Sequence, residues 1–181
     1  KFFMAEEPKE KWLNYLALTT VILAVCATLS TFKGGSFSTR SVISQTQAAN
    51  QWAYYQAKSI KGYLYEIQKE SLELEFKKTE VRGTKALTDE YEKKIALYSQ
   101  KIKKYDEEKA EISKEAKKME SIRDDAQKHS GIFGIAVIFL QIAILLSSIA
   151  ALLKKKVIWA IGVATGAIGL VYFANGFLLF W

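Results

Sequence analysis

Three long apolar runs without a charged side chain constrain this sequence more than any other feature. They cover residues 12–32, 131–153 and 157–181. An apolar run longer than about 18 residues is typical of a helix that crosses a bilayer, because a hydrocarbon core of about 30 Å needs roughly 20 helical residues. The sequence therefore predicts three transmembrane helices, with the lipid bilayer as their surroundings.

A cleaved signal peptide is the alternative interpretation of the first run, because basic residues precede it. Its apolar part is longer than the roughly 7–15 residues of a signal-peptide core, and no clear A-x-A cleavage pattern follows. We expect a retained membrane anchor after an N-terminal tail of residues 1–11.

Charged residues gather between the first two runs, mainly in residues 58–128. The formal net charge is +7, but acidic residues interleave with the basic ones. Such mixing is typical of a solvated helical surface and disfavours nucleic acid as a partner. Since Pro8 is the only proline, long helices are allowed everywhere after it.

This charged segment predicts an all-α extramembrane domain over residues 36–130, folded as an antiparallel helical hairpin. We expect helices at about 39–78 and 88–129, each about 60 Å long by helical rise. The expected helix ends are marked by glycines and hydroxyl side chains: Gly34 and Gly35 as a break, Ser36 or Ser38 as a cap, Gly83 in the turn, and Thr88 as the second cap. A further kink or break is expected near Gly131 and Gly134.

Each predicted hairpin helix carries a stripe at spacings near three and four. In the first helix the stripe comprises Ile43, Thr46, Asn50, Ala53, Ala57, Ile60, Leu64, Ile67, Ser71 and Leu74. In the second it comprises Tyr91, Ile95, Tyr98, Ile102, Tyr105, Ile112, Ala116, Met119 and Ala126, interrupted by Lys109 and Arg123. The second stripe is much more regular than the first, and its sustained spacing of 3.5 residues is the coiled-coil signature. Such a stripe must pack on the neighbouring helix, on another copy of the chain, or on both.

The stretch QWAYYQAKSIKGYLYEI is unusually aromatic. One interpretation is that its rings fill a wide helical core. The other is an interaction face for a partner or for self-assembly, formed by Trp52, Tyr55, Tyr63 and Tyr65. Gly62 costs about 1 kcal/mol relative to alanine in a helix, which close helix approach would offset.

Small and polar residues in the spans indicate helix packing. Gly162, Gly166 and Gly169 have the small-residue spacing that lets helices approach closely, either within the chain or between subunits. Hydroxyl and amide residues such as Thr19, Gln141 and Asn175 are expected to bond between helices. No span contains an Asp, Glu, Lys, Arg or His side chain, which disfavours proton relays and ion pathways.

The three consecutive lysines between the last two runs predict the topology. Lys154, Lys155 and Lys156 form a short basic loop, and such loops stay in the cytoplasm. The N-terminus is then cytoplasmic and the hairpin extracytoplasmic. The hairpin is itself rich in lysine, but segments of about 100 residues translocate largely regardless of charge.

Residues that would carry chemistry are scarce. His129 is the only histidine and Cys26 the only cysteine, so we expect no zinc site, catalytic triad or disulfide. The cluster of Asp106, Glu107, Glu108 and Glu111 is interleaved with lysines, as on a solvated helix face. We therefore expect no enzymatic activity, no cofactor and no small-molecule substrate.

Three segments carry a resemblance to a known family: EKWLNYLALTTVILAV, QWAYYQAKSIK and FLQIAILLSSIAALLKKK. They resemble a family of bacterial membrane proteins known only as a domain of unknown function, and the likeness extends over nearly the whole chain. The resemblance implies a location in the bacterial inner membrane. It implies no catalytic or cofactor-binding residue.

These features favour a non-catalytic, membrane-anchored helical stalk that acts as a structural, scaffolding or accessory subunit. We expect it to form a homo-oligomer or to join a larger membrane complex. The alternatives are a subunit of an oligomeric pore or transport complex, and an anchor for a catalytic partner.

Overall fold

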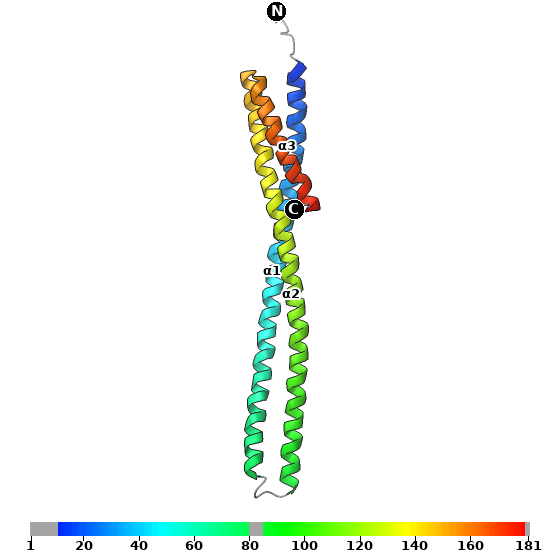
Figure 1. The fold of residues 1–181 in the computed structure, drawn as a ribbon, viewed down its shortest axis with the longest axis vertical. Helices are drawn as coiled ribbons and strands as arrows, with labels where there is room; N and C mark the ends of the chain where they lie inside the picture. The colour runs from blue at the N-terminus through cyan, green and yellow to red at the C-terminus, as the bar shows by residue number, and fades with distance from the viewer. Residues whose placement is uncertain (1–10, 80–84, 180–181) are drawn as a thin grey trace, which may run out of the picture. The chain divides into compact units, whose positions relative to one another are not determined.

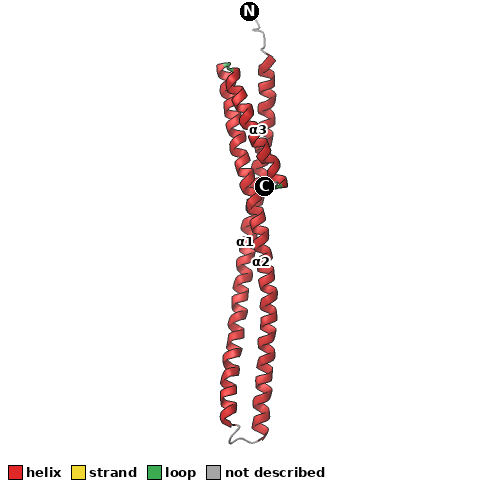
Figure 2. Cartoon of the chain, in the orientation of Figure 1, coloured by secondary structure: helices red, strands yellow, loops and turns green. Residues whose placement is uncertain are grey.

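The computed structural model describes residues 11–79 and 85–179, and almost all of these residues are helical (Figure 2). The helices are α1 (Lys11–Thr79), α2 (Lys85–Leu153) and α3 (Lys156–Leu178), coloured in chain order in Figure 1. Each contains a stretch long and apolar enough to cross a membrane. No strand occurs in the described ranges. The predicted all-α class with three apolar spans is therefore confirmed.

The described residues divide into two compact units. The three-helix unit contains the residues up to Val42 and those from Arg123 onward, whereas the hairpin unit is Ile43–Ile122. Both α1 and α2 contribute to each unit, because each is a single uninterrupted helix. All of α3 belongs to the three-helix unit.

The expected helix break at Gly34 and Gly35 is wrong, since α1 continues through both residues. Gly34 is needed for close packing instead: a Cβ atom placed there would lie 3.1 Å from Cβ of Phe133. The Ser130 hydroxyl also donates to the Gly34 carbonyl over 3.0 Å. Tertiary contact with α2 at Gly34 therefore outweighs the low helix propensity of glycine at this position.

The other expected helix ends also need correction. Ser36 and Ser38 lie inside α1, and α2 begins at Lys85, so Thr88 lies inside a helix rather than at its start. The expected turn residue Gly83 lies outside the described residues. No break occurs at Gly131 or Gly134, because α2 runs through both.

In the hairpin unit, α1 and α2 pack antiparallel along coiled-coil-like faces. Trp52 contacts Glu120 near one end, and Phe76 lies 6.2 Å from Tyr91 by ring centroids near the other. The stripe expected on the second helix is correctly placed, since its members within this unit, from Tyr91 to Met119, are all buried or half-buried. The facing residues of α1 are Ser44, Ala48, Gln51, Tyr55, Lys58, Gly62, Tyr65, Lys69, Leu72 and Phe76.

The stripe predicted for the first helix does not pack on α2. We call it the outer stripe (Ile43, Thr46, Asn50, Ala53, Ala57, Ile60, Leu64, Ile67, Ser71 and Leu74), and all its members are exposed. Leu64 is 54% exposed and Ile60 61%. The neighbouring helix is thus not the partner of this stripe; the face that packs combines small residues such as Ser44 and Ala48 with tyrosines and lysine stems.

The three-helix unit is centred on α2. Six of its residues at alternating spacings of three and four are fully buried: Phe133, Ala136, Leu140, Ala143, Ser147 and Ala150. Leu23 and Ala27 of α1 complete one apolar cluster with Leu140 and Ala143. Trp12 and Leu16 complete a second with Ala150. Close packing around small residues is the usual way in which membrane helices associate.

A tight connection joins α2 to α3. Lys154 has a left-handed backbone with φ of 50°, Lys155 precedes the first turn of α3, and Lys156 is already helical. The Lys155 amide donates to the carbonyl of Ala150 over 3.2 Å, which closes the end of α2. All three lysine side chains are exposed.

Gly62 offers a test of how the hairpin helices pack. A Cβ at this buried position would lie 3.8 Å from Cβ of Tyr105, an ordinary contact distance. Gly62→Ala should therefore recover helix propensity without a clash and stabilise the protein by about 0.5–1 kcal/mol. Chemical denaturation followed by circular dichroism measures this change. A loss of stability would contradict the observed spacing.

Candidate functional site

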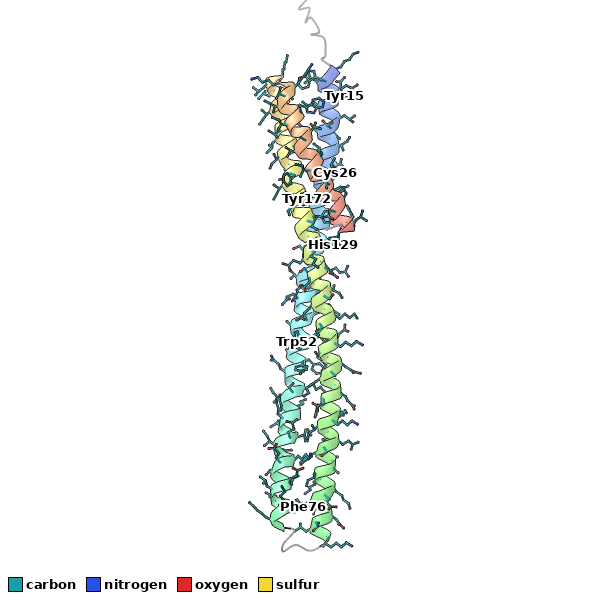
Figure 3. All side chains as sticks on the ribbon, viewed as in Figure 1. Tyr15, Cys26, Trp52, Phe76, His129 and Tyr172 are labelled. Atoms are coloured by element: carbon teal, nitrogen blue, oxygen red, sulfur yellow. The ribbon has the colours of Figure 1, made fainter. Side chains whose placement is uncertain are left out.

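The aromatic residues singled out from the sequence do not share one outer surface. Trp52 is half-buried, and its Nε1 donates to Oε1 of Glu120 on α2 over 2.9 Å. Its ring lies edge-on to Tyr55, 5.5 Å away. Tyr63 is 57% exposed, whereas Tyr55 and Tyr65 are half-buried. Figure 3 labels Trp52 and Phe76 on α1 of the hairpin unit. Three of the four proposed residues thus lie on the half-buried side of the hairpin.

Tyr65 lies at the centre of an aromatic cluster between the two hairpin helices. Its ring centroid is 5.5 Å from that of Tyr98 and 5.8 Å from that of Tyr105. The Lys101 ammonium donates to the Tyr65 hydroxyl over 3.2 Å and lies 5.0 Å from the ring centroid. The first interpretation of the aromatic stretch, rings filling a wide helical core, describes this cluster.

Lys58 is a largely enclosed charged residue in the contact between the hairpin helices. Its ammonium lies 2.6 Å from Oε2 of Glu108, and its side chain is 16% exposed. It also lies 5.3 Å from the Tyr54 ring and 5.4 Å from the Tyr105 ring. A lysine stem with aromatic neighbours covers apolar surface while its charge is neutralised at the tip.

Two charged pairs of the hairpin contain groups with shifted pKa values: Lys58–Glu108 between α1 and α2, and Lys109–Asp106 within α2. The hydrogen bond with Glu108 raises the pKa of Lys58, and the same bond lowers the pKa of Glu108. Asp106 raises the pKa of Lys109 in the same way. Both lysines and Glu108 are therefore driven further from neutrality, whereas a general acid or base needs a pKa near the working pH.

Metal-ligating residues do not gather in the described ranges. No group of three or more histidine, cysteine, aspartate or glutamate side chains there is close enough to hold an ion. Of the expected acidic cluster, Glu108 pairs with Lys58 of α1, and Asp106 pairs with Lys109 over 2.7 Å. These carboxylates thus serve ion pairs in the hairpin.

The glycines predicted to mediate helix packing lie inside the three-helix unit, and all three are buried. A Cβ at Gly162 would be 3.2 Å from Leu146, one at Gly166 2.9 Å from Leu23, and one at Gly169 2.8 Å from Leu140. Gly176 follows the same pattern and would place a Cβ 2.7 Å from the Phe133 ring. Of the two expected locations, these contacts are within the chain.

Hydroxyl groups of the spans bond mainly along their own helices. Thr20, Ser148 and Thr165 donate to carbonyls four residues earlier. Thr19 provides a bond between helices, since it accepts from Nε1 of Trp159 over 3.3 Å.

His129 has a structural setting that the sequence did not indicate. Its Nδ1 lies 2.7 Å from the Gly176 carbonyl. A carbonyl oxygen only accepts, so Nδ1 carries the proton. The ring stacks on Phe37 at 4.4 Å, so His129 links all three helices of its unit. The hydrophobic pattern of the sequence gives no signal for such a polar contact.

Residues 12–179 match a family model described as Domain of unknown function (DUF4337). This result confirms the predicted resemblance to an uncharacterised family. Neither the curated proteins nor the solved structures contain a match.

The pairing of Lys58 with Glu108 predicts a pH dependence. A carboxylate whose pKa is lowered on folding stabilises the folded state above its ordinary pKa of 4.5, and this stabilisation is lost as the pH falls through the folded value. Glu108→Gln should therefore lower the melting temperature at pH 7. The difference in melting temperature between this variant and the native chain should become smaller below pH 4.5.

Thermal melts of the detergent-solubilised chain, followed by circular dichroism between pH 7 and pH 3, measure this difference. Glu107→Gln, at the exposed neighbouring position, is the control and should show little change. A difference for Glu108→Gln that stays constant over the whole range would contradict the assigned ion pair.

The glycine contacts predict opposite effects at two positions of the three-helix unit. Gly169→Ala would bring its Cβ within 3.0 Å of the Leu140 backbone nitrogen, which cannot move freely. Overpacking should destabilise the protein by about 1–3 kcal/mol. Gly134→Ala, with nothing within 4 Å, is the matched control and should leave stability unchanged or slightly raised. Equal melting temperatures for the two variants would refute the described packing.

Proposed function

We propose that this chain, which belongs to the DUF4337 family, is a non-catalytic helical stalk anchored in the bacterial inner membrane. It acts as a structural, scaffolding or accessory subunit. Its partners are the lipid bilayer and further copies of the chain, or the other subunits of a larger membrane complex. It requires no cofactor for this role.

The observation that carries this proposal is that charged side chains in the hairpin unit lie in ion pairs. Lys58, Glu108 and Lys109 lie in ion pairs that move their pKa values away from neutrality. Lys101 is likewise engaged by an aromatic side chain. The Lys58–Glu108 pair and the Lys101–Tyr65 contact stabilise two long helices against each other, and the Lys109–Asp106 pair supports α2 itself; an extended support requires both.

Native mass measurement of the full chain, released gently from membranes, tests the proposed role. We expect either several copies of the chain or one copy with a stoichiometric partner. A population made up only of single, partner-free chains would argue against a scaffolding or accessory subunit. Thermal melts recorded on the same sample would verify that the chain is still folded.

We further propose that the N-terminus is cytoplasmic and the hairpin extracytoplasmic. The support is the short connection between α2 and α3, where Lys154, Lys155 and Lys156 are all exposed. Short lysine-rich loops are retained in the cytoplasm. Along the chain, the second span lies between the hairpin and this connection, both of which α2 joins. The hairpin is then on the opposite side of the membrane from the connection, and the first span, in α1, returns the N-terminus to the side of the connection.

Single cysteines test this topology. The native Cys26, the only cysteine of the chain, is first replaced by serine. A membrane-impermeant maleimide applied to intact spheroplasts should label Lys103→Cys on the exposed face of α2, and it should label Lys155→Cys only after permeabilisation. The reverse pattern would overturn the proposed orientation.

A further inference from the structure

The hairpin unit has one apolar surface that its own packing leaves open. This surface is the outer stripe of α1, which lies roughly 150° from the face that contacts α2, at about 100° per helical residue. Ile60, Leu64 and Ile67 are each more than half exposed. Consecutive members are three and four residues apart, as in a coiled-coil seam.

The outer face of α2 in the same unit shows what a solvated surface of this hairpin looks like. Most of its exposed residues are charged: Glu92, Lys93, Lys94, Lys103, Lys104, Asp106, Glu107, Glu111, Lys114, Lys117 and Lys118. By contrast, residues 43–57 of α1 contain no charged residue. In this unit each helix packs on the other, so the difference in charge is a property of the two outer surfaces themselves.

We propose that the outer stripe is the seam of a parallel, two-stranded coiled coil with a second copy of this chain. The inference rests on the proposed role as a self-associating stalk and identifies the surface that this role would use. Two uncharged faces of residues 43–57 meet without like-charge repulsion. A strongly charged partner would find no counter-charge there.

The continuity of α1 favours a parallel arrangement. A single helix runs from Lys11 through the outer stripe, so two copies inserted with the same topology present the stripe in the same direction. Membrane anchoring also keeps the two copies at a high local concentration. Identical residues then face each other in every layer of the seam.

Asn50 provides the registry element of this seam. It is exposed and shares its heptad position with Ile43, Ala57 and Leu64. A single asparagine at such a position pairs with its own copy across a parallel dimer and fixes the register and the strand number. Beyond Ile67, Glu70 would oppose Glu75 of the second copy, so the seam ends near that point.

Disulfide cross-linking in native membranes tests the seam directly, in a chain whose Cys26 is replaced by serine. Under mild oxidation, Ala53→Cys and Ala57→Cys should yield mostly covalent dimers. The matched control is Ala110→Cys, the same substitution at an exposed position of α2, and it should remain monomeric. Equal cross-linking at positions 57 and 110 would overturn the inference.

A charge introduced into the seam provides an independent test. Ile60→Lys with Leu64→Lys should halve the native mass, while circular dichroism shows unchanged helix content because neither side chain packs inside the hairpin. Asn50→Leu should instead broaden the distribution of copy numbers. An unchanged mass for the double-lysine variant would show that copies associate through another surface. This outcome would refute the proposed seam and would still agree with the proposed function.

Two further outcomes also count against the seam. A native chain that is already monomeric in membranes would remove both the inference and the proposed self-association. A dye attached at Ala57→Cys that reports an apolar environment, without any cross-linking at this position, would show that lipid covers the stripe instead.

Discussion

A seven-residue repeat along α2 is the constraint on which both units are built. Every seventh residue of α2 between Tyr91 and Ser147 is buried or half-buried: Tyr91, Tyr98, Tyr105, Ile112, Met119, Ala126, Phe133, Leu140 and Ser147. Because a helix has about 3.6 residues per turn, this spacing keeps one side of α2 turned toward its partners with only a slow drift. The repeat begins with tyrosines in the hairpin and continues with fully buried residues in the three-helix unit.

The two units accommodate polar side chains differently. In the hairpin, lysines enter the helix contact with their tips paired, as Lys58 does with Glu108 over 2.6 Å. In the three-helix unit, Thr20, Ser148 and Thr165 return to their own backbone, and glycines let the helices approach closely. A partly exposed ion pair is tolerated in water, and a hydroxyl bonded to its own backbone is tolerated in apolar surroundings.

The sequence predicted the apolar spans from long runs without charge, and it predicted the helical hairpin and the packing face of α2 from apolar and aromatic residues at regular spacing. The packing face predicted for α1 was wrong, because the face that contacts α2 contains the small residues Ser44, Ala48 and Gly62 together with lysine stems. A periodicity argument detects apolar residues and not the partner that covers them, so it selected the outer stripe. It also assigned a break to Gly34, since propensity is local whereas the contact with Phe133 is made between distant segments. The contact between His129 and Gly176 could not be predicted for the same reason, since it joins residues that are distant in the sequence.

The way α3 packs separates two requirements that usually compete within one helix. Its inner side offers bare backbone at Gly162, Gly166, Gly169 and Gly176, so the shape of the contact is set by side chains on α1 and α2. Its outward Ile161, Ile168 and Val171 take no part in that fit and remain exposed. This surface can therefore change in size and apolarity without altering the contacts between the helices. Substitutions on the outward side can alter how α3 meets its surroundings while the fit of the three helices to one another stays the same.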